Sequence, residues 1–264
     1  MLNLSTYTTL LLDMDGVLYR GDNPLPGVND LLGLCARRGV SYACVTNNST
    51  LTPQQYEEKL ARMGIRIPAA QIVTSSTATR RYLEHEFERG TPAFYVGMRG
   101  LHEALFADGY FVYDEQRPKL VVSGLDTELT YQKLKIATLA IRAGARYVAT
   151  NPDLTLPTEA GLVPGAGSII ALLRAATEVT PTVIGKPGGA MFQAALEIFG
   201  ADPLRTLTVG DRLDTDVAGA RAAGLAAGLV LTGVSTRDEV ARSELQPDEI
   251  FAGLPELVAA WELA

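Results

Sequence analysis

The chain has 264 residues, of which 47% are hydrophobic and 20% charged, and it carries a formal net charge of −7. This composition argues against a disordered or fibrous chain. The negative charge argues against broad binding to nucleic acid or to an anionic membrane surface. The length suggests one large domain or two moderate ones.

The compartment is predicted from what the sequence lacks. Residues 1–9 have no basic signal-peptide region, and no apolar run approaches the roughly 20 residues of a membrane span. Cys35 and Cys44, the two cysteines, have a spacing that fits neither a zinc site nor a disulfide framework. We therefore expect a cytoplasmic protein that does not contact membranes.

Short apolar runs alternate with helical patterns along the whole chain, which predicts an α/β fold. Because the runs are continuously apolar, they favour parallel strands covered on both faces, as in a doubly wound, Rossmann-like sheet. The predicted strands are Leu10–Leu12, Val40–Val45, Ile72–Val73, Ala93–Val96, Leu120–Val122, Tyr147–Ala149, Thr182–Ile184, Leu207–Val209 and Leu229–Leu231. Helices are predicted around 28–35, from Thr52-Pro53 to Gly64, and over 191–199.

Polar residues follow several of these strands directly. The first strand leads into Asp13-Met14-Asp15-Gly16, the second into Thr46-Asn47-Asn48, and a later one into Gly210-Asp211. Gly185-Lys186-Pro187 follows a fourth strand. Ligands of parallel α/β sheets bind outside the carboxyl ends of the strands, so we expect these clusters to converge on one crevice.

The residue types in these clusters indicate phosphoryl chemistry. Several carboxylates at one place need a cation to neutralise them, and hard oxygen ligands suit Mg²⁺. A lysine, a hydroxyl group and backbone amides can then neutralise and position a phosphoryl group. A carboxylate nucleophile completes the set.

The four motifs together resemble those of the haloacid dehalogenase superfamily of phosphatases, in its NagD-type, 4-nitrophenylphosphatase-like branch. The first motif is Asp13-Met14-Asp15-Gly16-Val17-Leu18, and the second is Thr46-Asn47-Asn48-Ser49. Gly185-Lys186-Pro187 matches the third, and residues 210–216 (Gly-Asp-Arg-Leu-Asp-Thr-Asp) match the fourth. Each motif alone is weak evidence, whereas four in this order form a specific pattern that spans nearly the whole chain.

The resemblance implies a role for each matching residue. Asp13 is expected to be the nucleophile and Asp15 the general acid and later base, with Mg²⁺ bound by Asp13, the Asp15 backbone carbonyl and Asp211. Asp216 is expected to support the metal site.

The remaining motif residues are expected to contact the substrate. Thr46 and Asn47, together with Asn48, are candidates for binding the phosphoryl group. Lys186 is expected to neutralise it and to keep Asp13 ionised. An aspartate at position 15 favours a phosphatase or phosphomutase, because ester hydrolysis has to protonate an alkoxide leaving group.

The motif spacing locates a second domain. Only 30 residues separate Asp15 from Thr46, whereas 139 separate Thr46 from Lys186. We therefore predict a catalytic core of residues 1–78 and 181–264 with an inserted α/β cap over 79–180, which resembles the cap of this branch. The cap is expected to exclude water from the phosphoryl donor. Phosphomutase relatives tend to place a cap in the first gap, which is too short here.

The prediction is a Mg²⁺-dependent phosphatase of small phosphorylated metabolites, such as sugar phosphates or nucleoside monophosphates, with p-nitrophenyl phosphate as an artificial substrate. One alternative is a phosphotransferase that passes the phosphoryl group to an acceptor alcohol. Another is a non-catalytic protein that binds a phosphorylated metabolite. The resemblance also implies a homodimer formed through the cap. Two cap loops, 151–153 and 164–167, resemble substrate-contacting loops of the branch, although turn chemistry alone explains their composition. The natural substrate stays open.

Overall fold

The computed structural model describes residues 2–158 and 160–264 and divides into two compact units. The first unit comprises Met1–Thr46, Gln54–Val73 and Lys186–Ala264, and the second comprises Asn47–Pro53 and Thr74–Gly185. The assignment of residues 79–180 as a cap, with 1–78 and 181–264 as the catalytic core, stays a prediction. In the described part of the chain, no helix is both long enough and apolar enough to cross a membrane.

A six-stranded sheet of order β15-β14-β13-β1-β4-β5 forms the centre of the first unit, and its pairings from β15 to β4 are parallel. The elements of this unit are η1 (Leu4–Thr6), β1 (Thr9–Leu12), β2 (Tyr19–Arg20), β3 (Asn23–Pro24), α1 (Val28–Arg38), β4 (Ser41–Thr46), α2 (Pro53–Arg62), η2 (Ala69–Gln71), β5 (Ile72–Thr74), α7 (Ala190–Phe199), η3 (Pro203–Arg205), β13 (Thr206–Gly210), η4 (Leu213–Val217), α8 (Ala218–Ala222), β14 (Ala226–Val230), α9 (Arg237–Arg242), β15 (Glu249–Phe251) and α10 (Leu254–Glu262).

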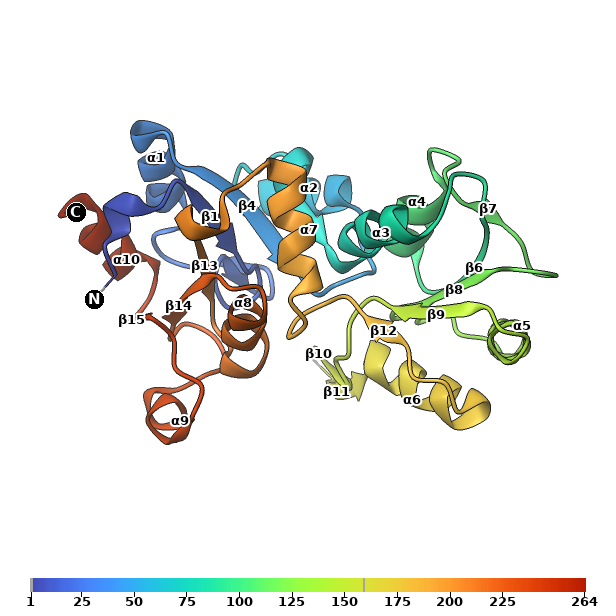
Figure 1. Cartoon of the computed structure of the whole chain (residues 1–264). Coiled ribbons are helices and arrows are strands. Elements are labelled where there is room, and N and C mark those ends of the chain that lie inside the picture. The colour runs from blue at the N-terminus through green and yellow to red at the C-terminus, as the bar shows by residue number, and fades with distance from the viewer. Residues whose placement is uncertain (1, 159) are drawn as a thin grey trace. The chain divides into compact units, whose positions relative to one another are not determined.

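Helices flank the sheet of the first unit on both faces (Figure 1). α1 packs against α10, whereas α7 contacts β4 and α8 contacts β14. All residues of β1 and β13 are buried, because neither face of these central strands meets water. This burial explains why the two strands are continuously apolar or threonine-rich rather than alternating in polarity.

The second unit is built on a five-stranded sheet of order β12-β9-β8-β6-β7, in which every pairing is parallel. Its elements are α3 (Ser75–Glu86), β6 (Pro92–Val96), α4 (Arg99–Phe106), β7 (Val112–Tyr113), β8 (Leu120–Ser123), α5 (Tyr131–Arg142), β9 (Arg146–Ala149), β10 (Thr155–Thr158), β11 (Gly161–Pro164), α6 (Ala166–Thr177) and β12 (Thr182–Val183).

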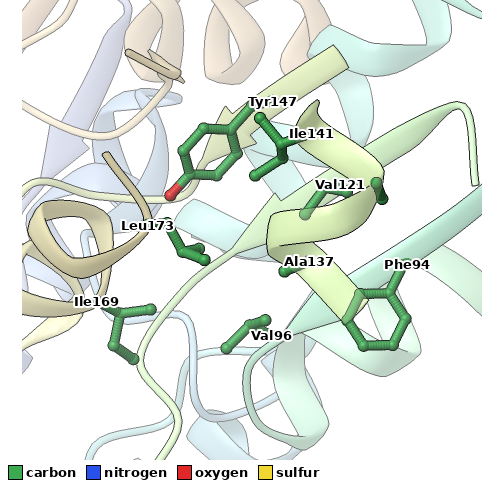
Figure 2. Close-up of a cluster of buried hydrophobic side chains, with 9 residues drawn as sticks. Phe94, Val96, Val121, Ala137, Ile141, Tyr147, Ile169 and Leu173 are labelled. Carbon is green, nitrogen blue, oxygen red and sulfur yellow. The ribbon is translucent and has the colours of Figure 1, made fainter. Parts of the chain in front are cut away.

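The hydrophobic core of the second unit lies between its sheet and the helices α5 and α6 (Figure 2). Ala137 and Ile141 of α5 and Leu173 of α6 face apolar side chains of β6 and β8, such as Phe94 and Val121. The core also includes Tyr147 of β9, the strand that precedes the 151–153 loop.

The predicted α/β fold with a mainly parallel sheet is confirmed, and every predicted strand has a counterpart. The last one begins earlier than predicted, at Ala226 instead of Leu229. Three helices begin at Val28, Pro53 and Ala190, close to their predicted starts.

Candidate active site

The site lies at the carboxyl edge of the first unit's sheet. β1 lies between β13 and β4, and Leu12 at its end pairs with Val209 on one side and Cys44 on the other. The backbone N–H of Asp13 still donates to the Val209 carbonyl, at 2.8 Å. The polar residues that follow the three strands therefore leave the sheet at the same edge, as predicted for Asp13, Asp211 and the end of β4.

Lys186 joins these strand ends through its ammonium group. Nζ donates to Asp13 Oδ1, to Asp216 Oδ1 at 2.7 Å, and to the Val45 carbonyl at 3.1 Å. The Lys186 side chain is 3% exposed. Burial lowers the pKa of Lys186, but the Asp13 and Asp216 carboxylates outweigh it and raise the pKa above its usual range. Lys186 is therefore a fixed positive charge.

Three carboxylates gather around this ammonium. Asp13, Asp211 and Asp216 each offer a ligand oxygen, and these oxygens lie within 4.8 Å of one another. Burial and the neighbouring Asp216 raise the pKa of Asp211 to about 6, and burial also raises the pKa of Asp13. One lysine does not balance three carboxylates, so the cluster fits a hard divalent cation that prefers oxygen ligands.

Asp211 is held in a pocket that two glycines make possible. A Cβ atom added to Gly16 would lie 2.5 Å from Asp211 Oδ2, and one added to Gly233 would lie 1.8 Å from it. Gly16 also has a φ of +80°, which favours glycine. The backbone N–H of Val234 donates to Asp211 Oδ2 at 2.7 Å. Sequence reasoning missed Gly233 and Val234, although their place shortly after the last predicted strand could have indicated them.

Asp216 occupies η4, a short π-helical segment that begins just after β13. Its Oδ2 accepts a hydrogen bond from the backbone N–H of Arg212, at 3.1 Å. A Cβ atom added to Gly210 would lie 2.2 Å from the Asp216 Cβ. A glycine at the end of β13 therefore leaves the space that the Asp216 side chain occupies. Asp214, by contrast, is exposed and forms an ion pair with Arg212 at 2.8 Å.

Asp15 has an exposed side chain in the turn between β1 and the β2–β3 hairpin. Partial desolvation raises the pKa of Asp15, and the Lys59 ammonium opposes this rise. The Lys59 Nζ atom lies 4.3 Å from the ring centroid of Tyr19. Tyr19 in turn forms an isolated β-bridge with Asp15. An exposed carboxyl with a raised pKa is suited to give a proton to a bound molecule.

The second motif divides between the two units. Thr46 ends β4 in the first unit and is buried, whereas Asn47 and Asn48 belong to the second. Asn48 Oδ1 accepts from both the N–H and the hydroxyl of Thr50, each at 2.7 Å, so this side chain builds a turn. Asn47 Nδ2 donates to Asp153 Oδ2 at 3.0 Å. Substrate contacts of all three motif residues stay predictions.

Two family models match the chain. A model described as haloacid dehalogenase-like hydrolase matches residues 10–111, and a second, described as HAD-hydrolase-like, matches residues 183–257. These two ranges contain all eight of the predicted site residues.

Individual relatives match over nearly the full length. The acid sugar phosphatase of Staphylococcus aureus is 38% identical over 98% of this chain and 100% of that protein. The structure of the 4-nitrophenylphosphatase of Thermotoga maritima is similar with a TM-score of 0.92 and 39% identity, over 98% of each chain. The structure of the glycerol phosphate phosphatase of Mycobacterium tuberculosis, solved in complex with magnesium, is similar with a TM-score of 0.89 and 36% identity. The match covers 96% of this chain and 78% of that one.

Proposed function

Because the chain belongs to the haloacid dehalogenase-like hydrolases, in their NagD-type, 4-nitrophenylphosphatase-like branch, we propose that it hydrolyses small phosphate monoesters through an aspartyl phosphate on Asp13. The observation that supports this most is the Lys186 ammonium bonded to both Asp13 and Asp216 beside Asp211. Sugar phosphates are the first substrate class to test, since a relative is named as a sugar phosphatase.

The first half of the reaction uses Asp13 and Asp15. An oxygen of Asp13 attacks phosphorus, and the bond from phosphorus to the substrate oxygen breaks. Asp15 gives its proton to that leaving oxygen, so the product is an alcohol. Lys186 stabilises the charge of the phosphoryl group, while Thr46 and Asn47, with Asn48 as a further candidate, donate hydrogen bonds to its oxygens.

The second half returns the enzyme to its starting state. Asp15, now a carboxylate, accepts a proton from a water molecule that attacks phosphorus. The bond between phosphorus and Asp13 breaks, which releases inorganic phosphate and restores the Asp13 carboxylate.

Mg²⁺ is the proposed cofactor, held by Asp13, Asp211 and the Asp15 backbone carbonyl, with Asp216 in support. The three-carboxylate cluster fits it by charge and ligand type, and a related phosphatase was solved with magnesium. When bound, the ion neutralises charge on the carboxylates and on the phosphoryl group.

The remaining proposals concern partners and location. A homodimer through residues 79–180 and a cytoplasmic location stay proposals, the latter resting on the sequence features and on Cys35 and Cys44, which are free and buried. The partner class is a small phosphorylated metabolite, with neither nucleic acid nor membrane expected.

The test is phosphate release from p-nitrophenyl phosphate and from a panel of sugar phosphates and nucleoside monophosphates, with Mg²⁺ and with chelator. We expect release that depends on Mg²⁺ and a preference within the panel. Adding glycerol or methanol distinguishes the phosphotransferase alternative, which predicts phosphorylated alcohol in place of free phosphate. Tight binding of a panel member without turnover would favour the binding-protein alternative.

A further inference from the structure

The carboxamide of Asn47 has a fixed orientation. Its Nδ2 donates to Asp153 Oδ2 at 3.0 Å, and because a carboxylate only accepts hydrogen bonds, the nitrogen has to face Asp153. The amide oxygen then lies beside Gly185, where an added Cβ atom would be 2.7 Å from Asn47 Oδ1. On the backbone side, Ser75 Oγ donates to the Asn47 carbonyl at 2.6 Å.

Asp153 is itself held by a line of buried polar side chains. Asn151 Nδ2 donates to the same Oδ2 atom at 2.7 Å, and Thr150 Oγ1 donates to Asn151 Oδ1 at 2.8 Å. Thr150 is fully buried and Asn151 is 6% exposed, so both side chains meet little water. In such surroundings linked hydrogen bonds strengthen one another and define one arrangement.

The backbone of Asp153 is fixed by the start of α6, because the segment 164–167, predicted as a loop, spans the end of β11, Gly165 and the first residues of α6. The N–H of Gly167 donates to the Asp153 carbonyl at 2.8 Å. A Cβ atom on Gly165 would lie 2.3 Å from that carbonyl oxygen, and one on Gly167 would lie 2.2 Å from the Pro152 carbonyl oxygen. Gly165 and Gly167 therefore permit the start of α6 to approach the 151–153 loop closely, which fixes the backbone position of Asp153.

We infer that Asp153 is a positioning residue for phosphoryl transfer, which acts by orienting the Asn47 amide toward the phosphoryl group. This inference rests on the proposed function, in which Asn47 donates to the phosphoryl oxygens. By accepting an N–H of Asn47 Nδ2, Asp153 fixes the rotation of the amide group to which the proposed function assigns the phosphoryl contact. Asn47 directly follows Thr46, the last residue of β4, in the sequence.

The test compares Asp153→Ala, Asp153→Asn, Asn47→Ala and the double variant Asn47→Ala/Asp153→Ala with p-nitrophenyl phosphate and Mg²⁺. Asp153→Ala removes the acceptor, and a misplaced donor lowers kcat/KM by about 10- to 100-fold. Asp153→Asn keeps an oxygen able to accept from both amides, so it stays within about fivefold of wild type. The double variant matches Asn47→Ala alone, because Asp153 then has nothing to orient.

Asp126→Ala is the matched control. Asp126 follows β8, the neighbour of β9 in the sheet, and its buried carboxylate pairs with Lys133 at 2.8 Å. Loss of the Asp126 carboxylate should lower the unfolding temperature and leave kcat/KM near wild type. In a double variant with Asn47→Ala, the effects of the two substitutions should add. Thermal unfolding of every variant separates lost folding from lost positioning.

The outcomes separate the inference from the proposed function. Wild-type activity in Asp153→Ala, or losses from Asn47→Ala and Asp153→Ala that add in the double variant, would overturn the inference and leave the phosphatase in place. Weaker inhibition of Asp153→Ala than of wild type by inorganic phosphate, with rescue in Asp153→Asn, would support it. A folded wild-type protein that neither hydrolyses p-nitrophenyl phosphate nor binds inorganic phosphate would overturn both.

Discussion

Replacing Lys186 with methionine should destabilise the first unit strongly. Methionine keeps most of the aliphatic stem, so packing changes little, but the ammonium that bonds Asp13, Asp216 and the Val45 carbonyl is lost. All three side chains are largely buried, with 3% exposure for Lys186, 13% for Asp13 and 5% for Asp216. Two carboxylates would then lie close together without their shared cation.

The expected cost is about 3–5 kcal/mol of unfolding free energy, the usual result of removing one partner from a buried ion pair. For a chain of this size each kcal/mol corresponds to about 2–4 °C in Tm, so Tm should fall by at least about 6 °C. The assay is thermal and urea unfolding in chelator, because a bound cation would partly replace the missing ammonium.

Lys59→Met provides the control, since Lys59 lies over the Tyr19 ring and its contact is worth about 1 kcal/mol or less. If Lys186→Met unfolds within about 1 kcal/mol of wild type in chelator, Lys186 does not hold the carboxylate cluster together, and the electrostatic account of the site is wrong.

Three further changes test separate parts of the account. Gly233→Ala places a Cβ atom 1.8 Å from Asp211 Oδ2, so the Mg²⁺ concentration for half-maximal activity should rise by about tenfold or more, and an unchanged Mg²⁺ titration would contradict the pocket described for Asp211. Asp15→Asn should slow hydrolysis of sugar phosphates by about 10²–10⁴-fold but that of p-nitrophenyl phosphate much less, because nitrophenolate leaves without a proton; equal slowing would exclude Asp15 as the acid. The hydrogen bond from Arg80 lowers the pKa of Asp108 to about 2. The ionised Asp108 therefore stabilises the fold above pH 4, and this contribution is lost as the pH falls toward 2. In urea unfolding, wild type should exceed Asp108→Asn in unfolding free energy by under about 1 kcal/mol above pH 4, and this difference should disappear toward pH 2. A difference that stays constant with pH would refute the ion pair of Arg80 and Asp108 as its source.

The fold could be predicted from the sequence because buried parallel strands leave a plain signal. β1 and β13 are short apolar or threonine-rich runs, and each leads directly into motif residues. The strands that were not predicted, such as β7 and β10, are short or exposed, so burial does not mark them in the sequence. Their positions depend on tertiary pairing instead.

The site was predictable only where its residues form motifs. Asp13, Lys186 and Asp211 lie in recognisable runs at strand ends, and the structure brings them together. The close approach of Gly233 to Asp211 is signalled in the sequence only by its place after the last predicted strand. The hydrogen bond of Asp153 reaches a residue more than 100 positions away, which no local pattern encodes.

The most direct test of the central claim is Mg²⁺-dependent phosphate release from p-nitrophenyl phosphate by wild type and Asp13→Asn, with Asp214→Asn as the control from the exposed part of the fourth motif. We predict activity in wild type and in Asp214→Asn that chelator abolishes, and no activity in Asp13→Asn. Equal activity of Asp13→Asn and wild type would contradict nucleophilic catalysis by Asp13.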